Sequence, residues 1–184
     1  MARGLAQPQL VALLSTLLDH HPALAQEVAA IMPLPDLATV EENLNYLKRN
    51  IYKALPSTRL ESKTDSMAYN RVSVHLVAFK KALLEQLKVL LDSHHWLSTI
   101  DFVVMAWNMV KATPVWSNPS HNTVRKTCFK QLAAGCMRAL REASLGAGQC
   151  REVRTKLERL KSEADEMLVC LKYLDFIISN GDTQ

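Results

Sequence analysis

The sequence predicts an all-α protein, and three observations support that prediction. Apolar residues recur at spacings of three and four along most of the 184 residues, which is the period of helices that are buried on one side. No stretch alternates apolar and polar residues over the length of a strand. The five glycines and seven prolines are few, and most prolines lie where a helix would begin or end. These patterns indicate about seven helical segments.

The composition indicates a folded protein of one domain, or one domain with a small appendage. Hydrophobic residues make up 48% of the chain and charged residues 22%, which is enough apolar material for a core. The net charge of +4 permits an acidic partner or an anionic membrane surface without requiring nucleic acid. No apolar run approaches the ~18 residues that span a bilayer. The cysteines form no CxxC pair and no convincing signal peptide precedes them, which predicts reduced thiols in a cytosolic or nuclear protein.

Residues 1–56 are predicted to contain three short helices. A leucine-rich amphipathic helix stops near His20, and Pro22 fits the first turn of a second helix that ends before Pro33. Asp36 is the predicted N-cap of the third helix. The apolar positions of that third helix have the spacing of a coiled-coil seam: Leu37, Val40, Leu44, Leu47 and Ile51. The seam suits a homodimer contact, and packing within one chain explains it equally well.

A mostly polar stretch at residues 57–66 is the predicted linker between this N-terminal dimerisation region and a helical bundle at residues 67–184. The bundle is expected to open with a long helix that ends near Asp92. A capping box at Ser98 and Asp101 predicts the start of the next helix.

Two further helices complete the predicted bundle. One passes through Phe129 and Leu140. The last keeps a heptad pattern from Val153 to Ile178 and is expected to run without a break. The chain should therefore pack as an antiparallel bundle.

Three polar residues interrupt the long helix that opens the bundle: Asn70, Arg71 and His75. Arg71 and His75 are four residues apart and share one side of the helix. Two interpretations follow. Asn70 and Arg71 bond carbonyl groups of a neighbouring loop, or this side of the helix forms a groove that recognises a partner.

A second polar cluster lies in the connector before the sixth helix: Trp116, Asn118, Pro119, His121 and Asn122. Trp116 is expected to pack, because a large indole is costly to leave in water. Asn118 before Pro119 favours a turn, and Ser120 is predicted to cap the next helix. A role in organising the backbone explains the cluster, and the same helix N-terminus could hold an anion.

The residues predict no catalytic site, no cofactor and no metal site. Motifs for phosphate loops, serine hydrolases and zinc proteases are missing from the sequence, and the four cysteines and six histidines fit no zinc-finger spacing. Basic residues cluster near Lys48 and again near Arg154, but glutamates interleave with the second cluster. No aromatic ladder accompanies either cluster, so a solvated face is favoured over nucleic-acid binding.

Two stretches, AYNRVSVHLVAFKKALL and PVWSNPSHNTVRK, together resemble the most characteristic motifs of the cut-eight family of nuclear proteasome-tethering factors. The region LLDHHPALAQEVAAIMPLPDLATVEENLNYLKRNIYKALP resembles the part of the family that precedes these motifs. The resemblance covers roughly residues 10–140.

The resemblance implies a non-enzymatic adaptor that tethers the 26S proteasome in the nucleus, at or near the nuclear envelope, and so supports nuclear protein degradation. It also implies a homodimer, a bundle similar to the 14-3-3 fold and contact with a membrane surface. The nucleus is the expected compartment, with the cytoplasm as the alternative. Yeast members of the family have a lysine-rich N-terminal segment that contacts the proteasome, whereas no lysine precedes Lys48 here. We therefore expect one of two explanations. Either this sequence is a truncated form of the protein, or this member of the family binds its partner differently.

Two other functions fit the same residues. One is a helical scaffold that binds acidic or phosphorylated ligands, which requires at least two converging basic side chains. The other is a peripheral membrane protein. Within the cut-eight interpretation, Tyr69 is expected to anchor the core beside residues 116–122, and Arg71 to bond carbonyl groups of that loop or an acidic partner.

Overall fold

The computed structural model describes residues 4, 6–31, 33–57, 61–160 and 165–181. Every secondary-structure element in these residues is helical, in agreement with the predicted all-α class. The chain divides into two compact units, Met1–Leu34 and Pro35–Gln184. The sequence placed this division at residues 57–66 instead. The difference arises because the helix after Asp36 packs along the helices that follow it, so it is part of the larger unit.

The smaller unit holds α1 (Gln7–His20) and α2 (Leu24–Ile31). Both helices lie close to where the sequence predicted them. The leucines of α1 line one side of the helix at a spacing of three and four, and they are 39–54% exposed: Leu10, Leu13, Leu14 and Leu17. Within the described residues, α1 therefore presents an uncovered apolar side.

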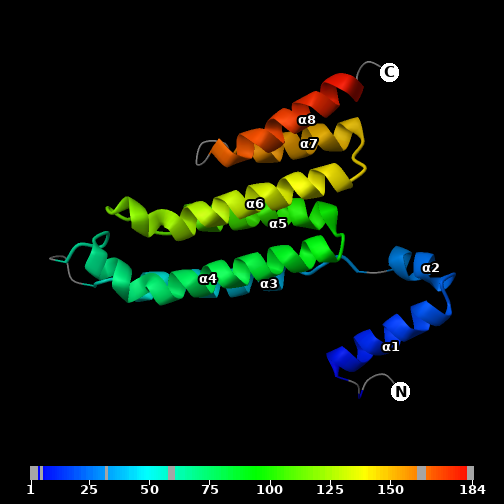
Figure 1. Ribbon diagram of the computed structural model, residues 1–184, viewed down its shortest axis with the longest axis horizontal. Coiled ribbons are helices and arrows are strands. Elements are labelled where there is room, and N and C mark those ends of the chain that lie inside the picture. The colour runs from blue at the N-terminus through cyan, green and yellow to red at the C-terminus, as the bar shows by residue number, and fades with distance from the viewer. Residues whose placement is uncertain (1–3, 5, 32, 58–60, 161–164, 182–184) are drawn as a thin grey trace. The chain divides into compact units, whose positions relative to one another are not determined.

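The larger unit is a stack of three helical hairpins (Figure 1). Its helices are α3 (Leu37–Lys53), α4 (Ser66–Asp92), α5 (Trp96–Lys111), α6 (Thr123–Glu142), α7 (Ala147–Glu158) and α8 (Leu168–Gly181). The pairs α3–α4, α5–α6 and α7–α8 form the hairpins. One layer consists of α3, α5 and α7, and the other of α4, α6 and α8. Two 3-10 turns, η2 (Pro119–Asn122) and η3 (Asp165–Met167), precede α6 and α8.

Helix α3 begins as predicted. The Asp36 carboxylate accepts hydrogen bonds from the amides of Ala38 (3.0 Å) and Thr39 (3.3 Å) and from the Thr39 hydroxyl (2.5 Å). The hydrogen bond from the Thr39 hydroxyl is the main reason that the pKa of Asp36 is lowered. This is the usual way in which an aspartate N-cap satisfies the first amides of a helix.

The predicted dimer seam of α3 is used inside the chain. Leu44 and Ile51 are 1% and 0% exposed, and the other three seam residues pack against the same core. The Tyr52 hydroxyl also donates a hydrogen bond to the Ala112 carbonyl at the end of α5. The heptad spacing of α3 therefore reflects intrachain packing on α4 and α5, which was one of the two interpretations.

Helix α4 buries one apolar stripe, which begins at the half-buried Tyr69. Its fully buried members are Val72, Leu76, Phe79, Leu83, Leu87 and Leu90. His94 lies in the short connection after α4 and has a positive φ of 58°. This conformation is common just beyond the C-terminus of a helix. Helix α5 then starts at Trp96. The predicted capping box at Ser98 is wrong, because Ser98 and Thr99 are already inside the helix and buried.

The predicted unbroken last helix is also wrong. Helix α7 ends at Glu158, and α8 runs back beside it. Arg154 of α7 forms an ion pair with Asp175 of α8, whereas 21 residues of straight helix would hold them about 30 Å apart. The same apolar pattern thus supplies two helices of a hairpin. Residues 161–164, which fall within the predicted helix, lie outside the described residues.

Candidate functional site

The two motif stretches that the sequence singled out meet at one end of the bundle. Tyr69 stacks on His121 with ring centroids 3.9 Å apart and an interplanar angle of 8°. Tyr69 also meets Trp116 edge to face at 5.3 Å, and Trp116 is only 4% exposed. Tyr69 therefore lies beside the 116–122 loop, where the sequence had placed it. We call these three rings, with Asn122 and Arg125, the junction cluster.

Asn122 holds the backbone of the loop in place. Its side chain accepts a hydrogen bond from the Trp116 amide and donates one to the Trp116 carbonyl, both at 2.9 Å. Asn118 accepts hydrogen bonds from the Ser120 amide (3.0 Å) and hydroxyl (2.9 Å). Asn118 is thus the cap of the turn at Pro119, and the prediction that Ser120 caps the next helix is wrong. These bonds satisfy polar groups that would otherwise be costly next to a packed indole.

Arg125 was missed by the sequence reasoning and is the best-bonded cation of the junction cluster. Its guanidinium donates to the carbonyls of Val110, Lys111 (2.8 Å) and Thr113 (3.1 Å) at the end of α5. The guanidinium also lies 5.0 Å from the centre of the Phe129 ring. A cation here satisfies the orphan carbonyls at a helix C-terminus and opposes the negative end of its dipole. Arg125 therefore ties α6 to α5.

Arg71 does not contact the loop as expected. Its guanidinium lies 3.4 Å from the carboxylate of Glu61, and both side chains are about half exposed. A hollow of about 200 Å³ beside this pair is also lined by Asp65, whose carboxylate accepts a hydrogen bond from the Ala68 amide. Asn70 is exposed and His75 half-buried. Among the described residues no hydrogen bond joins Arg71 to the 116–122 loop, and the carbonyls that Arg125 bonds belong to the end of α5.

A small cavity of about 10 Å³ lies beneath the junction cluster, lined in part by Trp116, His121, Arg125 and Cys128. Its size suits one water molecule. Within the described residues, the buried Nδ1 of His121 has no hydrogen-bond partner. Burial raises the pKa of the Cys128 thiol to about 11, so this thiol is protonated at neutral pH and is a poor nucleophile. The cavity is therefore a packing feature of the bundle.

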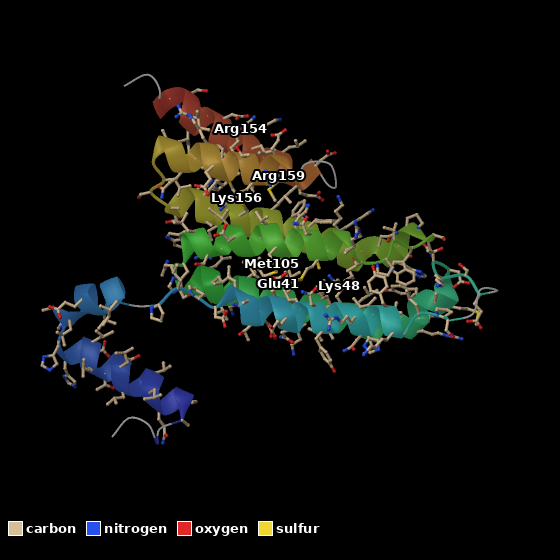
Figure 2. The ribbon with its side chains drawn as sticks, turned by 180° about the vertical axis from the view of Figure 1, so that it is seen from behind. Glu41, Lys48, Met105, Arg154, Lys156 and Arg159 are labelled. Atoms are coloured by element: carbon tan, nitrogen blue, oxygen red, sulfur yellow. The ribbon has the colours of Figure 1, made fainter. Side chains whose placement is uncertain are left out.

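Two basic residues of α7, Arg154 and Lys156, are paired with carboxylates. Lys156 lies 3.1 Å from Asp101 and 3.3 Å from Glu152, and its hydrogen bond with Asp101 raises its pKa. Arg154 pairs with Asp175 and Glu158. Figure 2 shows this face of the larger unit, with Glu41 and Lys48 on α3 and Arg154 and Lys156 on α7. A phosphate site would need converging cations without such partners.

The described part of the chain holds neither a cluster of metal-ligating side chains nor a membrane-spanning helix. No group of three or more His, Cys, Asp or Glu side chains there could hold a metal ion. No helix there is long and apolar enough to cross a bilayer.

The described fold and junction cluster define an all-helical bundle protein whose motif residues hold the bundle together. A sequence model of the Cut8 family, described as a nuclear proteasome tether protein, matches residues 2–178. The chain belongs to this family. It is 27% identical over 136 residues to the tethering factor for nuclear proteasome cut8 of Schizosaccharomyces pombe, which corresponds to 73% of this chain and 51% of that protein. The chain thus spans about half the length of this curated relative.

Proposed function

We propose that this chain is a non-enzymatic adaptor that tethers the 26S proteasome in the nucleus. The observation that supports the proposal best is the family match over residues 2–178. The fission-yeast relative is named as a tethering factor for nuclear proteasome, and the proposal extends that role to this chain.

The junction cluster limits which residues can contact a partner. Tyr69, Trp116, Asn122 and Arg125 already use their rings and polar groups within the bundle. The characteristic motifs of the family are therefore proposed to fix the hairpin stack, and the partner is proposed to contact its outer faces.

Binding to purified 26S proteasome tests the proposal directly. The immobilised chain is expected to retain proteasome peptidase activity from solution. A matched Arg125→Leu chain, which is less stable, is expected to lose retention only at a temperature where its folded circular dichroism signal is lost and that of the wild type remains. The exposed Arg49→Leu variant, which lies outside α6, controls for loss of a cation. If the folded wild-type chain retained no peptidase activity, the tethering proposal would be wrong.

We further propose that the chain forms a homodimer and contacts the membrane surface at the nuclear envelope. The uncovered leucines of α1 support self-association, because exposed apolar rows of this kind commonly mark interfaces. Sedimentation equilibrium should show a dimer for the wild-type chain and a monomer for the Leu13→Asp/Leu17→Asp variant. Flotation with anionic vesicles should weaken with salt if the membrane contact is electrostatic.

A further inference from the structure

The outer side of α6 has a row of cations, of which only Lys126 belongs to the two motif stretches. Lys126, Lys130, Arg138 and Arg141 are all exposed, and Ala134 lies at the centre of the row. Steps of four, four, four and three residues keep these five positions on one side of a helix. The row is about 22 Å long. Figure 1 shows α6 in the layer between α4 and α8. We call these five residues the α6 row.

The charge of the α6 row is not balanced locally. The sequence contains no acidic residue from Phe102 to Arg141. Glu142 follows directly at the end of α6, but among the described residues it forms no ion pair with Arg138 or Arg141. Among the residues that the structure describes, no ion pair involves the four cations of the row. On neighbouring α4, the positive charge of Lys80 acts on the Cys128 thiol of α6, which places Lys80 close to the same helix. The chain as a whole has a net charge of only +4, so positive charge is concentrated on this side.

The shape of the row suits a rod-like partner. Exposed Ala134 has no side chain beyond Cβ, and it is flanked by long flexible cations at positions 130 and 138. A second helix can therefore approach α6 closely at its centre, while the cations reach the carboxylates on either side. A helix of about 15 residues matches the length of the row.

The residues of the row favour a protein partner over the alternatives. A membrane-bound helix inserts large apolar side chains, and the α6 row has none because the apolar side of α6 is buried in the core. Single-stranded nucleic acid binds best where aromatic rings stack on its bases, and no aromatic residue belongs to the row. Carboxylates spaced along a helix complement the cations without either feature.

We infer that the α6 row is a docking site for an acidic helix of a protein partner. The site is distinct from the junction cluster, which contacts the other side of α6. The inference does not depend on the proposed tethering, and it can be tested without proteasome.

The probe is a covalently stapled helical peptide of about 15 residues, with glutamates on one side at spacings of four and three. A control peptide of the same composition distributes its glutamates around the helix. Fluorescence anisotropy measures the binding of both to the full chain. The Lys130→Glu/Arg138→Glu variant changes the row, and the Arg49→Glu/Lys63→Glu variant makes the same change of charge at two exposed positions elsewhere.

The one-sided peptide should bind the wild-type chain at least about five-fold more tightly than the control peptide, and the row variant should lose about ten-fold in affinity. The Arg49→Glu/Lys63→Glu variant should lose less than about two-fold. Equal losses in both variants would show general charge attraction and overturn the inference. So would equal binding of the two peptides, or no binding of either. Preferential, row-dependent binding of phosphatidylserine vesicles or duplex DNA over the one-sided peptide would assign the row to another class of partner and also overturn it.

Discussion

Helices α6 and α7 are both basic, but their cations are in opposite situations. In α7, Arg154 and Lys156 each contact two carboxylates, one on the same helix and one on a neighbouring helix. In α6, Arg125 is bonded to the carbonyls at the end of α5, while the α6 row has no ion pair among the described residues. The number of cations on a helix therefore says little about how many can bind a partner. Their availability depends on the acidic groups and open carbonyls of the helices packed beside them.

The largest effect should come from Arg125, the cation of α6 that is used internally. Arg125→Leu removes the guanidinium that donates to the carbonyls of Lys111 and Thr113 at the end of α5, while keeping helix propensity nearly constant. It should lower the free energy of unfolding by about 2–3 kcal/mol. The matched Arg138→Leu change, on the exposed side, should stay within about 0.5 kcal/mol. Urea unfolding of both variants measures the difference, and equal shifts would contradict the division of α6 into two sides.

Substitution of Asn122 should cause the second-largest loss of stability, because its side chain fixes the loop that precedes α6. Asn122→Ala removes both hydrogen bonds to the backbone of Trp116 and should cost about 2 kcal/mol. The near-ultraviolet circular dichroism of the aromatic cluster should weaken at the same time. Asn70→Ala, on the exposed side of α4, is the control and should not destabilise the chain. Unchanged stability in Asn122→Ala would mean that water replaces both bonds.

Much of this arrangement could be predicted from the sequence. Regular apolar spacing predicted the positions of α3, α4 and α6 closely. The two motif stretches led to the prediction that Tyr69 lies beside the loop that holds Trp116, and the structure shows this contact. The unbroken last helix was wrong because the apolar pattern continues across the turn without a proline or glycine to mark it. Periodicity reports which side of a helix is buried, and it cannot report that the chain reverses.

Arg125 was missed for a related reason. It lies four residues before Phe129 and three before Cys128, so it shares the buried side of α6. A cation in register with an apolar stripe is a signal of an internal role. The carbonyls that it bonds, however, belong to the end of α5, and their position depends on the tertiary fold. The long stretch without acidic residues around α6 was visible in the sequence. Only the structure shows which cations of that stretch are exposed.

The ion pairs of α7 should have a measurable but smaller effect. Lys156→Gln should lower the free energy of unfolding by about 0.2–1 kcal/mol at neutral pH, because the pairs are partly exposed. The folded pKa of Lys156 is raised above its ordinary value of 10.5. The contribution of its charge is therefore fully present below pH 10.5 and is lost as the pH rises through the folded value. The difference between wild type and Lys156→Gln, measured by urea unfolding at neutral and alkaline pH, should shrink accordingly. A constant difference would show that packing, and not charge, is responsible.

The smallest expected effect on stability comes from the α6 row, and it tests the comparison of α6 with α7 most sharply. A substitution in the row should change the free energy of unfolding in the opposite direction to Lys156→Gln. Lys126 and Lys130 are like charges one turn apart on α6, and such pairs destabilise a helix by about 0.2–0.5 kcal/mol. Lys130→Gln should therefore raise the free energy of unfolding slightly at low salt, and the gain should disappear as salt screens the repulsion. The same lysine-to-glutamine change thus stabilises α6 and destabilises α7. If Lys130→Gln lowered stability at low salt, carboxylates would have to balance the α6 row in solution, and the row would then be no more available to an acidic partner than the cations of α7.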